Sequence, residues 1–201
     1  MGDRCYQCFR PKTSCFCATI PRINNRTDIL ILQHVAERSH PFNTARIVRK
    51  ALCRCNVIAG HNQELAARQL PIAANAGLLY PGEDVPALTD LLVAERPDQL
   101  VIIDGTWHQA RTIFRDVAQM QDLPCYRLSP SSPGQYRIRL EPNAHSLSTL
   151  EATVAALQVL EPETAGLDQL LAAFNTMVES QLGHATYGSA GRKRVRPSRP
   201  R

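Results

Sequence analysis

Residues 100–107 read Leu-Val-Ile-Ile-Asp-Gly-Thr-Trp, and this stretch decides the fold. Its apolar run predicts a buried strand that ends at Asp104. Apolar residues then recur at helical spacing over 107–120, so the strand passes into a helix at Gly105. Because ligands of open α/β sheets bind at this carboxyl edge, Asp104 and Trp107 are candidate functional residues. The same pattern also fits a helix cap at Asp104, a turn at Gly105 and a core position for Trp107.

The flanking sequence predicts an α/β fold. Short apolar strands alternate with helical patterns, which indicates a mainly parallel sheet with helices on both faces. The expected strands are 28–34, 56–59, 76–80, 99–104 and 125–128. The expected helices between them are 44–53, 62–69, 86–95 and 107–120, and two more lie within 147–183, split near Glu161 and Pro162.

Composition excludes several classes of protein. The chain has 201 residues, 44% of them hydrophobic, and no apolar run of membrane-spanning length. No apolar stretch precedes the first cysteine, so we expect no secretory signal and a cytoplasmic, reducing location. Neither G-x-G-x-x-G nor G-x-x-x-x-G-K-[ST] occurs, which argues against an ordinary dinucleotide fold and a P-loop NTPase. Nothing in the sequence indicates an obligate protein partner.

The net charge of +5 is concentrated at one end of the chain. Residues 188–201 are rich in Gly, Ser, Pro and Arg and contain no acid, and the rest of the chain is close to neutral. We expect residues 187–201 to be a disordered basic tail. Such a tail is either a solvated extension or an arm that binds phosphates.

Four cysteines near the N-terminus have the spacing C-x2-C-x6-C-x-C, at Cys5, Cys8, Cys15 and Cys17. Zinc prefers four tetrahedral thiolates, and closely spaced pairs can each supply half of them. Residues 1–20 are therefore expected to form a zinc-binding segment, in which the metal is structural because no position is left open for a substrate. The alternatives are unconnected reduced cysteines or adventitious disulfides.

Two polar stretches flank the predicted sheet edge. A loop with His40 and Asn43 precedes a helix that carries Arg46 and Arg49, and Arg111 lies on the helix after Trp107. Arginines outnumber lysines by 20 to 3, which fits nucleic acid, although solvated helix faces and high-GC coding also produce such patterns. Further along, the spacing of Ser148 and Glu151 also fits a simple capping box.

Together these motifs resemble the DTW-domain family of tRNA-uridine aminocarboxypropyltransferases. The resemblance follows the chain in order: C-x2-C and C-x-C, then HPxNTxR at 40–46, LYPG at 79–82, D-x-T-W at 104–107 and STLEA at 148–152. The sequence departs from the family at Val35, where proline often follows the histidine of the first strand. This departure affects the shape of one loop.

The resemblance implies a fold related to SPOUT RNA methyltransferases, with a deep trefoil knot in the C-terminal half, for residues 21–186. It implies S-adenosylmethionine as cosubstrate and tRNA as partner. The implied reaction transfers the 3-amino-3-carboxypropyl group to a uridine ring nitrogen and releases methylthioadenosine. The alternatives are an RNA methyltransferase of the SPOUT type and a non-catalytic, zinc-containing RNA-binding protein.

The resemblance also implies roles for individual residues. Asp104 would ionise or hold the uridine, and Trp107 would pack against the aminocarboxypropyl chain. The expected cofactor contacts are Tyr80, Pro81, Gly82, Thr106, Trp107, Ser148, Thr149 and Glu151. The expected RNA contacts are His40, Asn43, Arg46, Arg49 and Arg111.

Overall fold

The computed structural model describes residues 3–40, 43–82, 84–129 and 147–190. Its centre is a sheet with strand order β2-β1-β4-β3-β5. The strands are β1 (Asp28–His34), β2 (Cys55–Gly60), β3 (Ala76–Leu79), β4 (Gln99–Asp104) and β5 (Cys125–Tyr126). Neighbouring strands pair in parallel throughout, so the predicted parallel sheet is confirmed.

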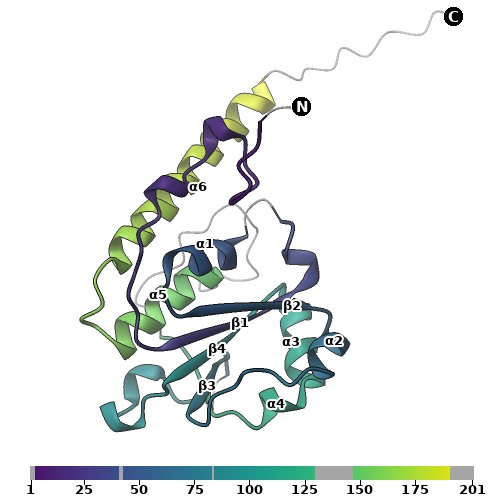
Figure 1. The fold of residues 1–201 in the computed structure, drawn as a ribbon, viewed down its shortest axis with the longest axis vertical. Helices are drawn as coiled ribbons and strands as arrows, with labels where there is room; N and C mark the ends of the chain where they lie inside the picture. Colours follow the sequence, from purple (N-terminus) through teal and green to yellow (C-terminus); the bar gives the residue numbers. More distant parts are fainter. Residues whose placement is uncertain (1–2, 41–42, 83, 130–146, 191–201) are drawn as a thin grey trace, which may run out of the picture.

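Helices cover both faces of this sheet (Figure 1). One face carries α1 (Thr44–Ala51), α5 (Thr149–Leu160) and, outside them, α6 (Leu167–Ala190). The other face carries α2 (Asn62–Ala66), α3 (Trp107–Asp116) and α4 (Ala118–Gln121). Short 3₁₀ turns complete the described chain: η1 (Lys12–Ser14), η2 (Cys17–Thr19), η3 (Val35–Glu37), η4 (Leu88–Asp90) and η5 (Val93–Glu95).

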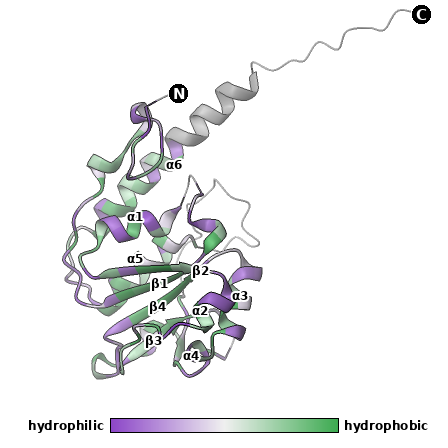
Figure 2. Ribbon diagram, turned by 45° about the vertical axis from the view of Figure 1, so that its right-hand side comes forward, coloured by the Kyte–Doolittle hydropathy of each residue, from purple (hydrophilic) through white to green (hydrophobic). Residues whose placement is uncertain are grey.

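The alternation of side chains along the central strands divides the core in two. Ile29 and Ile31 of β1 face α1 and α5, whereas Leu30 and Leu32 face α2 and α3. The central strands are correspondingly apolar on both sides, as the green ribbons of Figure 2 show. Burial of each such side chain contributes roughly 1.5–3 kcal/mol, so the two faces together fix β1 and β4 in the middle of the sheet.

The helix predicted over 86–95 is wrong. This segment instead contains η4 and η5. The N–H of Leu88 donates to the carbonyl of Arg127 at 2.9 Å, and the N–H of Arg127 donates to the carbonyl of Pro86 at 3.0 Å. These bonds hold the segment extended beside the end of β5, so its backbone groups are not available to a helix.

Other predicted helices are shorter than expected. The helix expected over 107–120 is divided at Val117, which has φ −93° and ψ 95°. The helix expected over 44–53 ends at Ala51, because Leu52 forms an isolated parallel bridge with Ile23. The last described helix, α6, continues to Ala190, seven residues beyond the range expected from the sequence.

Some expectations lie outside the described residues. The implied knot depends on the path of the chain between β5 and α5, and residues 130–146 there are not described. The same holds for residues 191–201 of the expected basic tail. Among the described helices, none combines the length and the apolar character that crossing a membrane requires.

The N-terminal cysteine segment, residues 3–20, packs beside α6 and α1 (Figure 1). Phe16 and Ile20 contact the core on this side of the sheet. Arg10 is buried, and its Nη2 donates to Sδ of Met177 on α6 at 2.8 Å. The two ends of the described chain therefore meet on one side of the molecule.

Candidate active site

The carboxylate of Asp104 lies at the carboxyl end of β4 and is held from both sides. Gln33 is its register partner on β1, and Nε2 of Gln33 donates to Oδ2 of Asp104 at 2.7 Å. The hydroxyl of Thr149, at the start of α5, donates to Oδ1. Gln33 is only 3% exposed, so this contact is sheltered from water. These two donors, one on each oxygen, fix the orientation of the carboxylate.

Asn43 extends this cluster toward α1. Its Oδ1 accepts from Nε2 of Gln33 at 3.2 Å and from the N–H of Arg46 at 2.9 Å, so Asn43 caps α1 as the sequence predicts. Its Nδ2 donates to the carbonyl of Glu37 at 2.9 Å. The N-termini of α1 and α5 therefore both point toward Asp104. Because helix N-termini carry partial positive charge, this arrangement favours the negative charge of the Asp104 carboxylate.

The sequence also allowed Asp104 to be a helix cap and Trp107 to be a core residue, and the structure contradicts both. Thr106, not Asp104, caps α3: its Oγ1 accepts from the N–H of Gln109 at 3.4 Å, and its own N–H donates to Oε1 of Gln109 at 2.7 Å. Trp107 is 43% exposed and does not fill the core. Gly105 does make the turn, because a Cβ there would lie 3.0 Å from Cβ of Gln109. Asp104 is thus not used as a helix cap, and Trp107 begins α3 with a partly exposed side chain.

The LYPG motif follows β3 at the same edge, next to β4. The ring of Tyr80 stacks on Phe114 of α3, with centroids 4.3 Å apart and planes at 20°. Burial raises the pKa of Tyr80, which keeps the phenol neutral. Pro81 and Gly82 are exposed, and a Cβ at Gly82 would lie 2.6 Å from Cγ2 of Val85. The structure therefore brings this motif to the edge where Asp104 lies.

At the start of α5 the capping-box alternative is confirmed. The N–H of Glu151 donates to Oγ of Ser148 at 3.3 Å, and the N–H of Ser148 donates to Oε2 of Glu151 at 2.9 Å. Both residues are buried. Thr149, which lies between them, is the residue of this motif that reaches Asp104.

Some of the expected RNA contacts are hydrogen-bonded within the protein, and others are exposed to solvent. Arg46 is engaged within the protein: its guanidinium donates to the carbonyls of Arg38 at 2.5 Å and Cys8 at 3.5 Å, and desolvation lowers its pKa. The N–H of His40 donates to the carbonyl of Glu37 at 3.0 Å. Arg49 and Arg111 are exposed on α1 and α3.

Sequence reasoning missed Gln33 as a member of this cluster. The available signal was a buried amide one residue before the end of an otherwise apolar strand. His34, next along β1, packs edge-on against His61 with ring centroids 5.3 Å apart. Desolvation and the neighbouring His61 lower the pKa of His34, which favours the neutral form of the His34 ring.

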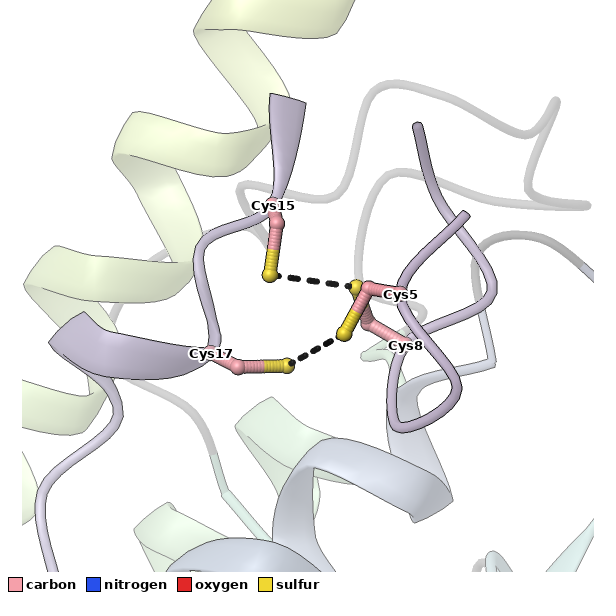
Figure 3. Close-up of side chains that lie close together, drawn as sticks. All are labelled: Cys5, Cys8, Cys15 and Cys17. Atoms are coloured by element: carbon pink, nitrogen blue, oxygen red, sulfur yellow. Dashed lines mark hydrogen bonds between the residues drawn. The ribbon is translucent and has the colours of Figure 1, made fainter. Parts of the chain in front are cut away.

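The N-terminal cysteines have the geometry of a metal site. Their sulfur atoms all lie within 4.8 Å of one another and point inward (Figure 3). The Cys5–Cys17 and Cys8–Cys15 sulfur pairs are 3.9 and 3.8 Å apart. A tetrahedral zinc site with Zn–S bonds of about 2.3 Å has sulfur atoms about 3.8 Å apart. The four thiols therefore fit a zinc ion, and none of them is in a disulfide.

The electrostatics of the cluster also favour a cation. Backbone N–H groups of Cys8 and Gln7 lower the pKa of Cys5 to about 6. Burial raises the pKa of Cys8 and of Cys17, and the neighbouring thiols raise that of Cys17 further. One thiolate forms readily and then opposes the next, so a bound divalent cation is what would allow all four to ionise.

Comparisons with known proteins agree with this arrangement. The family model of the DTW domain matches residues 2–182. A protein named tRNA-uridine aminocarboxypropyltransferase 2 from Mus musculus is 30% identical over 190 residues, which cover 90% of this chain and 64% of that protein. The protein of the same name from Drosophila melanogaster is 30% identical over 189 residues, covering 90% and 75%. This chain thus spans 64% of the length of the mouse relative.

Among solved structures, the SAM-dependent rRNA:acp-transferase Tsr3 from Vulcanisaeta distributa has a TM-score of 0.43 to this chain at 18% identity. The match covers 82% of this chain and 84% of that one. The match to the family model extends over nearly all of the described residues, including the cysteine segment, the sheet and α5. This chain therefore belongs to the DTW-domain family.

Proposed function

We propose that this protein transfers the 3-amino-3-carboxypropyl group of S-adenosylmethionine to a uridine in tRNA and releases methylthioadenosine. The observation that carries the proposal is the Asp104 carboxylate, fixed by Gln33 and Thr149 at the sheet edge beside the LYPG motif. The names of the mouse and Drosophila relatives support the choice of reaction and of tRNA as substrate.

The residues at this edge fit S-adenosylmethionine. The molecule carries a positive sulfonium and an amino group, for which Asp104 offers negative charge. Its polar groups would bind at the N-terminus of α5, where Ser148, Thr149 and Glu151 lie. Its adenosine has apolar and aromatic surface that matches Tyr80, Pro81 and Gly82. Thr106 and the exposed Trp107 would border the aminocarboxypropyl chain. When bound, S-adenosylmethionine supplies an alkyl group on a sulfur already activated for displacement.

The chain's own residues then have two tasks. Trp107 and the start of α5 orient the alkyl chain so that its γ-carbon, not the methyl group, faces the uridine. Asp104 accepts the proton of the uridine ring N–H. Gln33 and Thr149 each donate to one oxygen of its carboxylate and so hold the carboxylate in a fixed orientation. The ring nitrogen forms the new C–N bond as the C–S bond breaks, and the electron pair leaves with the sulfur of methylthioadenosine.

We propose that exposed arginines bind the RNA backbone. Arg49 and Arg111 lie on the helices that begin at the sheet edge, where they can reach phosphates on either side of the target uridine. His40, Asn43 and Arg46 would form the wall of the site that faces the RNA. Their contacts within the protein make this wall rigid.

We further propose that Cys5, Cys8, Cys15 and Cys17 hold a structural zinc ion. The thiol geometry supports this assignment. A reducing cytoplasmic location follows from the need to keep these thiols available to the metal. The protein would act on tRNA without an obligate protein partner.

The decisive experiment incubates purified protein with unmodified tRNA and S-adenosylmethionine and then measures nucleoside masses. We expect one uridine to gain the aminocarboxypropyl mass and methylthioadenosine to appear in equal amount. A methyl gain with S-adenosylhomocysteine would instead identify a methyltransferase. Binding of tRNA without any product would favour a non-catalytic RNA-binding protein.

The role of Asp104 is tested by Asp104→Asn, which keeps the shape of the side chain and removes its basicity. We expect the transfer rate to fall by roughly 10²- to 10⁴-fold. Transfer at the wild-type rate, with S-adenosylmethionine binding intact, would exclude proton removal by Asp104.

A further inference from the structure

Two aromatic side chains on the cysteine segment are exposed to solvent. Tyr6 is 90% exposed, and Phe9 is 50% exposed. They flank Cys8, so a metal held by the cysteines would fix the loop that carries them. Large aromatic side chains that stay exposed on a rigid loop do not stabilise the core. Such side chains are typical of surfaces that bind a partner.

The backbone of Phe9 strengthens this argument. Its φ of 58° is in the left-handed region, and Phe9 is the one non-glycine residue with positive φ in the described chain. Glycine adopts this conformation without strain, whereas a side chain with a Cβ does not. One face of the ring packs on the Arg46 guanidinium, and half of the side-chain surface still faces solvent. The ring is therefore a candidate for direct contact with a ligand.

The surroundings of Phe9 are strongly basic. The guanidinium of Arg46 lies over one face of the ring, 4.4 Å from its centroid, and is itself held by the carbonyls of Arg38 and Cys8. Residues 3–17 and 44–51 together contain six basic residues and one acidic residue, Asp3, which forms an ion pair with Lys12. Even with a zinc tetrathiolate, which carries two negative charges, this surface is positive.

A cavity of about 420 Å³ adjoins this surface, between the cysteine segment, α1 and α6. Phe16, Ile20, Ile47 and Met177 give it apolar walls. Its polar lining includes the thiols of Cys8 and Cys17 and six basic and amide side chains: Gln7, Arg10, Asn43, Arg46, Arg49 and Lys50. This combination of apolar wall and cationic rim matches a nucleotide, which presents a flat base and an anionic phosphate.

The cavity is linked to the candidate active site through Asn43. Asn43 lines the cavity, and its Oδ1 accepts from the same Gln33 amide that donates to Asp104. The Gln33 side chain therefore lies between Asn43, at the cavity, and Asp104, in the candidate active site. A nucleotide in the cavity would therefore lie near a uridine held at Asp104.

We propose that the cysteine segment and α1 form a binding site for an unpaired nucleotide of the RNA substrate, close in the chain to the target uridine. The phosphate enters the cavity beside Arg49 and Lys50, and the base lies outside the cavity on the exposed side of Phe9 or Tyr6. This proposal rests on the proposed function for its RNA ligand. Aromatic rings recognise unpaired bases, whereas a duplex offers no free base face, so the site selects a single-stranded part of the RNA.

The test measures binding of unmodified tRNA to the full-length, zinc-loaded protein by fluorescence anisotropy. Phe9→Gly removes the ring and relieves the positive φ, so it should leave the melting temperature unchanged or raised. We expect at least one of the two variants Phe9→Gly and Tyr6→Ala to weaken tRNA binding roughly fivefold or more. A single-stranded oligouridylate should compete with tRNA for the wild-type protein, and a blunt RNA duplex should not.

Two control variants lie elsewhere on the surface. Leu92→Ala removes an exposed apolar side chain, and Arg68→Glu reverses an exposed charge after α2. Both should bind tRNA within about twofold of wild type, as expected for changes outside the site. If the wild type binds tRNA and transfers the group while Phe9→Gly and Tyr6→Ala bind equally well, this inference is wrong and the proposed function stands. If the wild type binds no tRNA, both are wrong.

Discussion

The contact between Thr149 and Asp104 gives a sharp test of the candidate site. Thr149→Val keeps the β-branched shape and removes the hydroxyl that donates to Oδ1 of Asp104. A hydrogen bond to a charged group contributes about 1.5–3 kcal/mol. If this energy holds the carboxylate in its reactive orientation, kcat/KM for transfer falls roughly 10- to 150-fold. The start of α5 should stay folded, because Ser148 and Glu151 still cap it.

The assay is single-turnover transfer to unmodified tRNA, with thermal melting measured on the same preparations. Thr149→Ser restores the hydroxyl and should recover most of the rate. Thr176→Val is a matched control, because that hydroxyl donates only within its own helix, to the carbonyl of Ala172 at 2.9 Å. Wild-type transfer by folded Thr149→Val protein would refute the claim that this hydroxyl positions Asp104.

Three further predictions concern stability. Removing zinc with a chelator, or replacing Cys8 with Ser, should lower the melting temperature by roughly 5–11 °C, since a metal at a hundred times its Kd contributes about 2.7 kcal/mol; an unchanged melting curve would contradict a structural metal. Glu161 is 1% exposed and accepts from the N–H groups of Arg26 and Thr27, so Glu161→Gln should reduce the free energy of unfolding by about 2–3 kcal/mol in urea titrations. Arg54 lowers the pKa of Asp28, so their ion pair stabilises the fold above the usual aspartate pKa and is lost as the pH falls through the lowered value. Asp28→Asn should therefore cause a small loss of stability at neutral pH and none in strong acid; an equal loss at both pH values would exclude this linkage.

The strands could be predicted because their signal is local. A run such as 100–103 is apolar on both faces, and only a buried parallel strand satisfies that pattern over so few residues. The prediction of a helix over 86–95 was wrong because the conformation of this segment depends on a residue that is distant in the sequence. Residues there pair with Arg127, and no property of the segment itself indicates this bond.

The sequence predicted only those site residues whose position follows from local pattern. Asp104 follows from its place at the end of a strand, which the sequence gives directly. Gln33 and Thr149 join it through strand register and through the packing of α5 on the sheet, across 71 and 45 residues of chain. Arg46 was assigned to RNA from its charge, but its contacts with Phe9 and Cys8 depend on how the cysteine segment folds back onto α1.

The packing of Arg10 on Met177 has a consequence for synthesis of the protein on the ribosome. The two residues are 167 positions apart, so the cysteine segment leaves the ribosome 167 residues before its helical partner. During that interval the segment has no core to pack against, and metal coordination is the available means of ordering it. Zinc supply during translation should then govern the yield of native protein, even where the finished molecule holds its metal tightly.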